Sequence, residues 1–150
     1  MSLEQEPISL PPLPARILVM DDEASVRSIV RRILERKGCT VLEAADGEEA
    51  VRVYSESLTQ GPAIAAVIMD LSVPGGMGGL AAAAKVRELD PAARIIVASG
   101  YFDDRMLSDL DVLGSSGRLS KPFGPDDLVR TLTDALTDAG EAAEDAGAAS

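Results

Sequence analysis

The stretch VIMDLSVPGG, residues 67–76, joins a run of apolar residues to one aspartate and then to a segment rich in Pro and Gly. Short apolar runs bounded by such residues are typical of strands buried on both faces of a sheet. Taken alone, Asp70 is read as a helix cap or a solvated strand end. The alternative is that a carboxylate at the end of a buried strand is placed there to react.

Strand-like and helix-like segments alternate on both sides of this stretch. Three apolar runs are continuous, as central strands require, and two mixed runs suit the edges of a sheet. Their alternation with helices indicates βαβ units. The sequence therefore predicts an α/β fold, a doubly wound five-stranded parallel sheet of flavodoxin-like order 2-1-3-4-5 with helices on both faces. The predicted strands, central ones first, are residues 16–20, 65–69, 94–98, 40–44 and 117–120.

Helix signals mark the segments between these strands. Gly38 suits the position that follows a helix. Asp46 and Glu49 have the spacing of a capping box, and Pro125 suits the first position of a helix. The predicted helices are residues 24–37, 47–57, 79–89, 104–113 and 125–136.

Polar residues follow four of the predicted strands. Asp21 and Asp22 follow the first, Asp70 the third, Ser99 the fourth and Lys121 the fifth. In a sheet of this order, functional groups gather beyond the carboxyl ends of the strands, where the first and third strands lie side by side. The fold is therefore expected to bring these residues into one pocket, and this coincidence favours a functional role for Asp70.

Three aspartates in one pocket repel one another unless a cation lies among them. Oxygen ligands alone favour Mg²⁺. A carboxylate beside Mg²⁺ and the Lys121 ammonium can attack a phosphoryl group, because both cations neutralise the charge on the phosphoryl oxygens. The Ser99 hydroxyl can donate a hydrogen bond to one of these oxygens. Asp70 would then carry an acyl phosphate.

Composition limits the alternatives. The chain has 150 residues, enough for one domain with a core, and 46% of them are hydrophobic. The net charge of −11 argues against nucleic acid as a partner. The absence of His excludes His-based catalysis and His metal ligands within this chain. Cys39, the single cysteine, is expected to be a buried apolar residue in a reducing compartment.

Three regions are expected along the chain. Residues 1–15 contain four prolines and are predicted to be a flexible arm or linker. Residues 16–138 form the folded domain, and residues 139–150 form a loose, acidic, Ala-rich tail. No apolar run reaches the ~18 residues of a membrane span, and the acidic N-terminus does not resemble a signal peptide. We therefore expect a cytoplasmic protein with no membrane partner.

Four motifs, in order and at family spacing, resemble the receiver domain of two-component response regulators. The resemblance covers about residues 15–136 and is nearest to receivers attached to hybrid histidine kinases. It implies a signalling switch rather than an enzyme. Such a switch catalyses only its own phosphorylation and dephosphorylation. It also implies a histidine kinase or histidine phosphotransfer protein as donor, an unknown downstream partner, and no output domain in this chain. The motifs are ILVMDDEASVRSIV, VIMDLSVPGG, VASGY and LSKPF.

The resemblance also assigns roles within the pocket. Asp70 is implied as the phosphoacceptor, with Ser99 and Lys121 as its hydroxyl and lysine partners, and Asp21 and Asp22 as the acidic pair around Mg²⁺. The metal ligands would be Asp22, Asp70 and the backbone carbonyl of Ser72. A cis peptide bond between Lys121 and Pro122 is also implied.

Three departures from the family pattern stand out. The loop that contains residues 75–79 is one residue longer than usual, and Arg118 replaces the switch aromatic. Tyr101 either shields the site or is a packed loop aromatic. Two other classes remain open: a Mg²⁺-dependent phosphohydrolase with an aspartyl nucleophile, and a degenerate receiver that only binds a partner.

Overall fold

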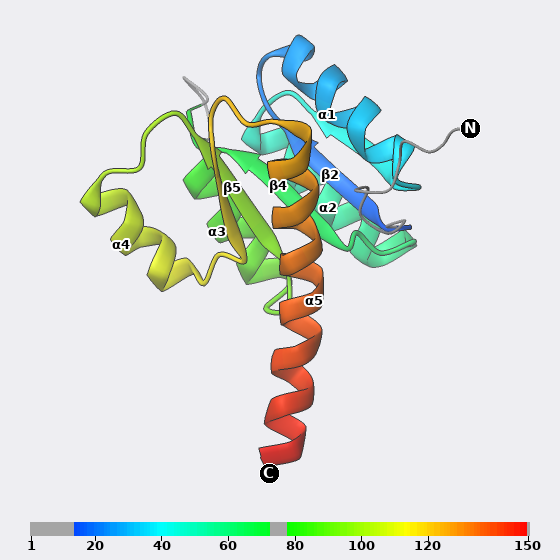
Figure 1. The fold of residues 1–150 in the computed structure, drawn as a ribbon, viewed down its shortest axis with the longest axis vertical. Helices are drawn as coiled ribbons and strands as arrows, with labels where there is room; N and C mark the ends of the chain where they lie inside the picture. Colours follow the sequence, from blue (N-terminus) through cyan, green and yellow to red (C-terminus); the bar gives the residue numbers. More distant parts are fainter. Residues whose placement is uncertain (1–13, 73–77, 150) are drawn as a thin grey trace.

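The computed structural model describes residues 14–72 and 78–149. Within them, five strands form one parallel sheet in the spatial order β3-β2-β4-β5-β6 (Figure 1). Counted along the chain, this is the order 2-1-3-4-5, so the predicted fold class is confirmed. The strands are β2 (Arg16–Met20), β3 (Thr40–Ala44), β4 (Ala66–Asp70), β5 (Ile95–Ser99) and β6 (Gly117–Ser120).

The division into central and edge strands follows the sequence pattern. Every residue of β4 and β5 is buried, including the polar residue that ends each of them. The edge strand β6 buries only Leu119 fully. The continuous apolar runs of the sequence form central strands, since both faces of such strands are covered.

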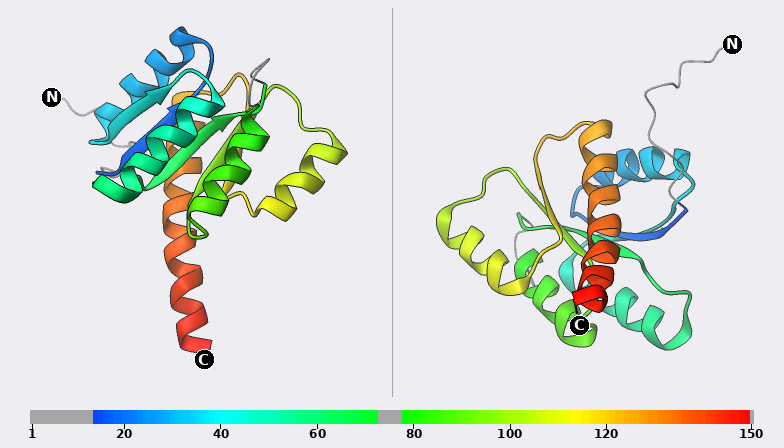
Figure 2. Two further views of the ribbon diagram at one scale, coloured as in Figure 1. Left: turned by 180° about the vertical axis from the view of Figure 1, so that it is seen from behind. Right: turned by 60° about the horizontal axis from the view of Figure 1, so that its bottom comes forward.

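Helices cover both faces of the sheet, as Figure 2 shows from behind and from below. Buried side chains of α1 and α5 pack on one face, and those of α2, α3 and α4 pack on the other. Both cores are almost entirely aliphatic, as the scarcity of aromatic residues requires. The helices are α1 (Ala24–Arg36), α2 (Gly47–Gln60), α3 (Gly79–Leu89), α4 (Asp104–Leu113) and α5 (Pro125–Ala149).

The predicted helix signals are confirmed. Gly38 follows α1 with a φ of 95°, a conformation that favours glycine. The Asp46 side chain accepts a hydrogen bond from the Glu49 N–H at 2.8 Å. The Glu49 carboxylate reaches back to the N–H of Ala45, also at 2.8 Å. Pro125 is the first residue of α5.

The last helix is longer than the sequence pattern predicted. We expected α5 to end near Leu136 and a loose tail from residue 139, but α5 continues to Ala149 (Figure 1). Alanine and glutamate have high helix propensity, and no proline follows Pro125 to stop the helix. The acidic, Ala-rich composition of this segment suits a tail, but its residues also have high helix propensity, and they continue the helix.

Within the described residues, two peptide bonds that precede proline are cis. The Lys121–Pro122 bond is cis, as the family resemblance implied, and so is the Gly61–Pro62 bond, which was not predicted.

The predicted N-terminal arm lies outside the described residues apart from Pro14 and Ala15, and most of the loop that contains residues 75–79 also lies outside them. None of the helices in the described part of the chain combines the length and the apolar character needed to span a membrane.

Candidate functional site

Asp70 ends the central strand β4 with only 2% of its surface exposed. One carboxylate oxygen, Oδ1, accepts a hydrogen bond from the Ser72 N–H at 2.9 Å. The other, Oδ2, lies 3.2 Å from Nζ of Lys121. The helix that follows is capped by Gly78 rather than by Asp70. Asp70 is therefore neither a helix cap nor a solvated strand end.

The acidic pair lies at the end of the neighbouring strand β2. Asp21 is 3% exposed, and its Oδ2 lies 2.8 Å from Nζ of Lys121. Asp22 is exposed. One carboxylate oxygen from each of Asp21, Asp22 and Asp70 lies within 4.8 Å of the others. The N-cap of α1 is Glu23, so neither aspartate of the pair caps that helix.

Lys121 links the two buried carboxylates. Burial alone would lower the pKa of its ammonium, but the hydrogen bond to Asp21 and the charge of Asp70 outweigh that effect, so the pKa lies above its ordinary value. The lysine therefore stays protonated at neutral pH. It neutralises part of the negative charge and can attract phosphoryl oxygens.

Ser99 ends β5 at the same edge and is 3% exposed. Its hydroxyl donates to the Tyr101 carbonyl at 2.8 Å and accepts from the Tyr101 N–H at 3.2 Å. The hydroxyl is thus engaged with the backbone beside the pocket. The Tyr101 side chain is 74% exposed, so its interpretation as a packed loop aromatic is wrong. Arg118 is also exposed.

The predicted cation site fits the residues that the fold brings together. Three carboxylates approach one another, and the Lys121 ammonium contacts two of them, so the cluster keeps an excess of negative charge. Two of these carboxylates are buried, where like charges repel more strongly than in water. A donor set made only of oxygen atoms suits Mg²⁺. The Ser72 carbonyl remains a predicted ligand.

Two residues that hold this site were missed by the sequence analysis. The Arg27 guanidinium donates to the Asp21 carbonyl at 2.6 Å. Gly79 approaches the Asp70 backbone so closely that a Cβ atom there would lie 2.0 Å from the Asp70 carbonyl oxygen. The sequence shows an arginine in the first predicted helix and a Gly-Gly pair at the start of the third. The contacts of these residues, however, depend on how the chain folds.

An apolar hollow of about 370 Å³ adjoins the site on the side of α1. Lys121 forms part of its wall, and Ile29, with 57% of its surface exposed, forms another part. The lining residues of the hollow are Glu23, Val26, Ile29, Val30, Lys121, Pro122 and Phe123.

The chain belongs to the response regulator receiver domain family, whose profile matches residues 17–133. Members of this family are phosphoacceptor switches of two-component signalling that bind Mg²⁺ in an acidic pocket. In this chain, the carboxylates of Asp21, Asp22 and Asp70 form an acidic cluster.

Individual relatives agree with this assignment. The chemotaxis protein CheY of Thermotoga maritima is 35% identical over 118 residues, which cover 78% of this chain and 93% of that protein. The sensor kinase CckA of Brucella abortus is 33% identical over 122 residues, which cover 81% of this chain but 12% of the kinase. A complex of CheX, CheY, BeF₃ and Mg²⁺ from Borrelia burgdorferi has a TM-score of 0.72 at 26% identity, over 80% of this chain and 87% of that one.

Proposed function

We propose that this protein accepts a phosphoryl group on Asp70 from a phosphorylated histidine of a partner and thereby switches its interactions. The observation that carries the proposal is the setting of the Asp70 carboxylate. It is buried, held by the Ser72 N–H and the Lys121 ammonium, and lies beside the carboxylates of the acidic pair. These contacts fix the orientation of the Asp70 carboxylate, and its negative charge is only partly compensated.

The chemical step uses the residues of this pocket. An Asp70 oxygen attacks phosphorus, an O–P bond forms, and the P–N bond to the donor imidazole breaks. The electron pair of the broken bond stays on the imidazole nitrogen, which takes up a proton, and Asp70 becomes an acyl phosphate. Lys121 stabilises the charge on the phosphoryl oxygens. Ser99 can contribute its hydroxyl once the hydrogen bond to Tyr101 is exchanged.

The residues proposed to hold Mg²⁺ are Asp21, Asp22 and Asp70, together with the backbone carbonyl of Ser72. The donor set supports this assignment because it consists of oxygen atoms, and two of its three carboxylates are buried. When bound, the metal would neutralise negative charge on the transferred group. Asp21 and Lys121 orient one another through their 2.8 Å contact.

We propose a sensor histidine kinase or a histidine phosphotransfer protein as the phosphoryl donor. This chain contains no histidine that could itself supply the group. The match to part of the sensor kinase CckA supports a place among receivers of the hybrid-kinase type. The apolar hollow beside Lys121 gives such a partner a surface next to the reacting carboxylate.

Intact-mass analysis after incubation with acetyl phosphate tests the assignment. The wild type should gain one phosphoryl group with Mg²⁺ and none in EDTA, whereas Asp70→Asn should gain none. Asp111→Asn, which removes an exposed aspartate of α4, is the matched control and should behave like the wild type.

Three outcomes would contradict the proposal. A phosphoryl group on Asp70→Asn would place the acceptor elsewhere. An unmodified wild type would favour a degenerate receiver that only binds a partner. Steady turnover of a small phosphomonoester would favour a phosphohydrolase.

A further inference from the structure

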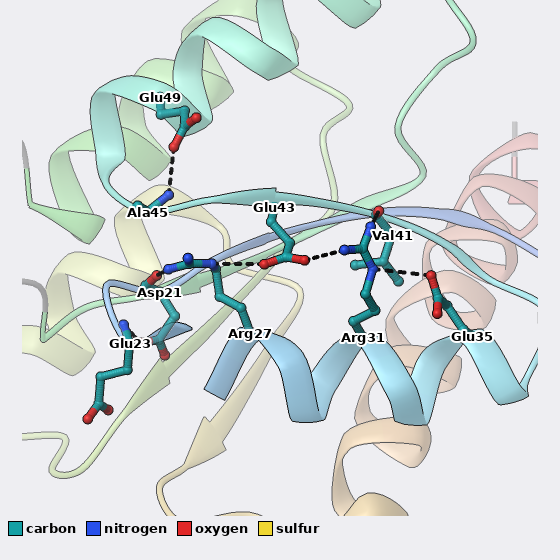
Figure 3. A network of polar contacts seen from close by, with 9 residues as sticks. All are labelled: Asp21, Glu23, Arg27, Arg31, Glu35, Val41, Glu43, Ala45 and Glu49. Atoms are coloured by element: carbon teal, nitrogen blue, oxygen red, sulfur yellow. Dashed lines mark hydrogen bonds and ion pairs between the residues drawn. The ribbon is translucent and has the colours of Figure 1, made fainter. Parts of the chain in front are cut away.

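The Arg27 side chain connects the acidic loop, residues 21–23 between β2 and α1, to the edge strand β3. Its Nη1 donates to the Asp21 carbonyl at 2.6 Å, and its Nε donates to Oε1 of Glu43 at 3.0 Å. Figure 3 shows the guanidinium between these two oxygens. Only 17% of the Arg27 side chain is exposed, so both contacts are largely shielded from solvent. One planar group thus ties α1, the end of β2 and strand β3 together.

Glu43 is itself held in place from its other side. Arg31, one turn further along α1, contacts the second carboxylate oxygen of Glu43 and donates to the Val41 carbonyl at 3.0 Å (Figure 3). The two arginines therefore share one carboxylate, but only Arg27 reaches the acidic loop. This difference makes Arg31 a natural internal control.

The backbone of the acidic loop determines where its carboxylates lie. The Asp21 N–H donates to the Ala44 carbonyl at 3.1 Å, and the Glu23 N–H donates to Oδ1 of Asp21 at 2.9 Å. Within the described residues, no hydrogen bond or ion pair holds the exposed Asp22 side chain. The position of the Asp22 carboxylate therefore depends on the peptide that follows Asp21, whose carbonyl Arg27 binds.

We propose that Arg27 is a positioning residue for the cation site, an inference that rests on the proposed function. By holding the Asp21 carbonyl, it fixes the loop so that the carboxylates of Asp21 and Asp22 converge with that of Asp70. Glu43, which Arg31 also contacts, compensates part of the charge of Arg27 and so weakens its repulsion of the cation. A guanidinium suits this task because its donors point in fixed directions within one plane. A lysine cannot hold both oxygens in that way.

Isothermal titration of the full chain with Mg²⁺ tests the proposal. Arg27→Ala should raise the dissociation constant for Mg²⁺ about 10-fold or more, as loss of groups that orient metal ligands does. Arg31→Ala removes the same charge and also contacts Glu43, yet its constant should stay within about two-fold of the wild type. Arg27→Lys should recover only part of the affinity. Phosphorylation of Arg27→Ala by acetyl phosphate should need more Mg²⁺ but approach the wild-type rate at saturation.

Urea unfolding in EDTA separates positioning from general stability. Both arginine variants should lose similar stability, because each gives up contacts of the same network. Equal Mg²⁺ constants for Arg27→Ala and Arg31→Ala would overturn the proposal while leaving the proposed function intact. A wild type without Mg²⁺ binding would overturn both. If Arg27→Ala does not fold, a wild-type constant for Arg27→Lys overturns the positioning role.

Discussion

Two polar clusters, one at the carboxyl ends of the strands (the carboxyl edge) and one around Arg87 at their amino ends (the amino edge), compensate charge differently. At the carboxyl edge, Lys121 faces the buried carboxylates of Asp21 and Asp70. At the amino edge, every hydrogen bond that Arg87 makes within the described residues goes to a backbone carbonyl. Its guanidinium donates to four such carbonyls, at 2.6–3.2 Å: Pro91 and Ala93 in the loop before β5, Leu113 at the end of α4, and Gly114 directly after it.

This difference distinguishes a polar cluster that stabilises the fold from one that favours reactivity. At the amino edge, each guanidinium nitrogen of Arg87 has an acceptor, and the Tyr54 hydroxyl there donates to Asp90 at 2.7 Å. Within the described residues, the carboxyl edge gathers three carboxylates, of which one ammonium contacts two, and so keeps uncompensated charge. Satisfied polar groups stabilise a fold, whereas crowded like charges oppose it and are found where function requires them.

The largest stability effect is expected at the amino edge. Arg87→Ala leaves four carbonyls without their donor and should lower the free energy of unfolding by about 2–4 kcal/mol. Urea denaturation in EDTA measures this loss. Arg52→Ala, which removes an arginine whose side chain is 57% exposed, should cost less than about 1 kcal/mol. If the two losses were equal, Arg87 would not be the structural centre of this edge.

A smaller effect is expected where α3 meets the carboxyl edge. Gly79→Ala would bring a Cβ atom against the Asp70 carbonyl, so the helix must shift. We expect a loss of about 1–3 kcal/mol, which is typical of overpacking. Gly78→Ala is the control, because a Cβ atom there meets nothing within 4 Å. Thermal unfolding of both variants measures the difference, and equal melting temperatures would show that the close approach carries no constraint.

The smallest effect concerns Tyr54 and depends on pH. Burial first, and then the hydrogen bond and charge of Asp90, raise the pKa of the Tyr54 phenol above its ordinary value. The folded state thus keeps this proton at a pH where the unfolded chain loses it. Tyr54 therefore stabilises the fold below about pH 10, and this contribution declines as the pH rises through the folded-state pKa.

Tyr54→Phe should cost about 1 kcal/mol near neutral pH. Urea unfolding of both proteins from about pH 8 to about pH 11 should show this gap becoming narrower. A gap that stays constant across the range would mean that the phenol titrates alike in the folded and unfolded states.

Much of this fold could be predicted because its signals are local. The apolar runs of β4 and β5 have no other place than the centre of a sheet, and the Asp46–Glu49 pair marks a helix start by spacing alone. The end of α5 was missed because its composition is typical both of a helix and of an acidic tail.

The candidate site likewise contains contacts that the sequence could predict and contacts that it could not. The approach of Asp21 and Asp22 to Asp70 follows from the strand order, since the carboxyl ends of neighbouring parallel strands meet. The contacts of Arg27 and Gly79 could not be predicted, because they depend on how a helix is seated on the sheet to within about an ångström. The hydrogen bonds of the Ser99 hydroxyl likewise depend on the local path of the loop.

Four thermal melts test the contrast between the edges most directly: wild type and Asp70→Asn, each in EDTA and in excess Mg²⁺ at one ionic strength. The variant loses one of three crowded charges while keeping its shape, so in EDTA it should melt above the wild type. At about ten times the dissociation constant, Mg²⁺ should add about 1.4 kcal/mol to the wild type and less to the variant. Equal Mg²⁺ shifts for both proteins would mean that the metal binds elsewhere, and the carboxyl edge would not be a site strained for function.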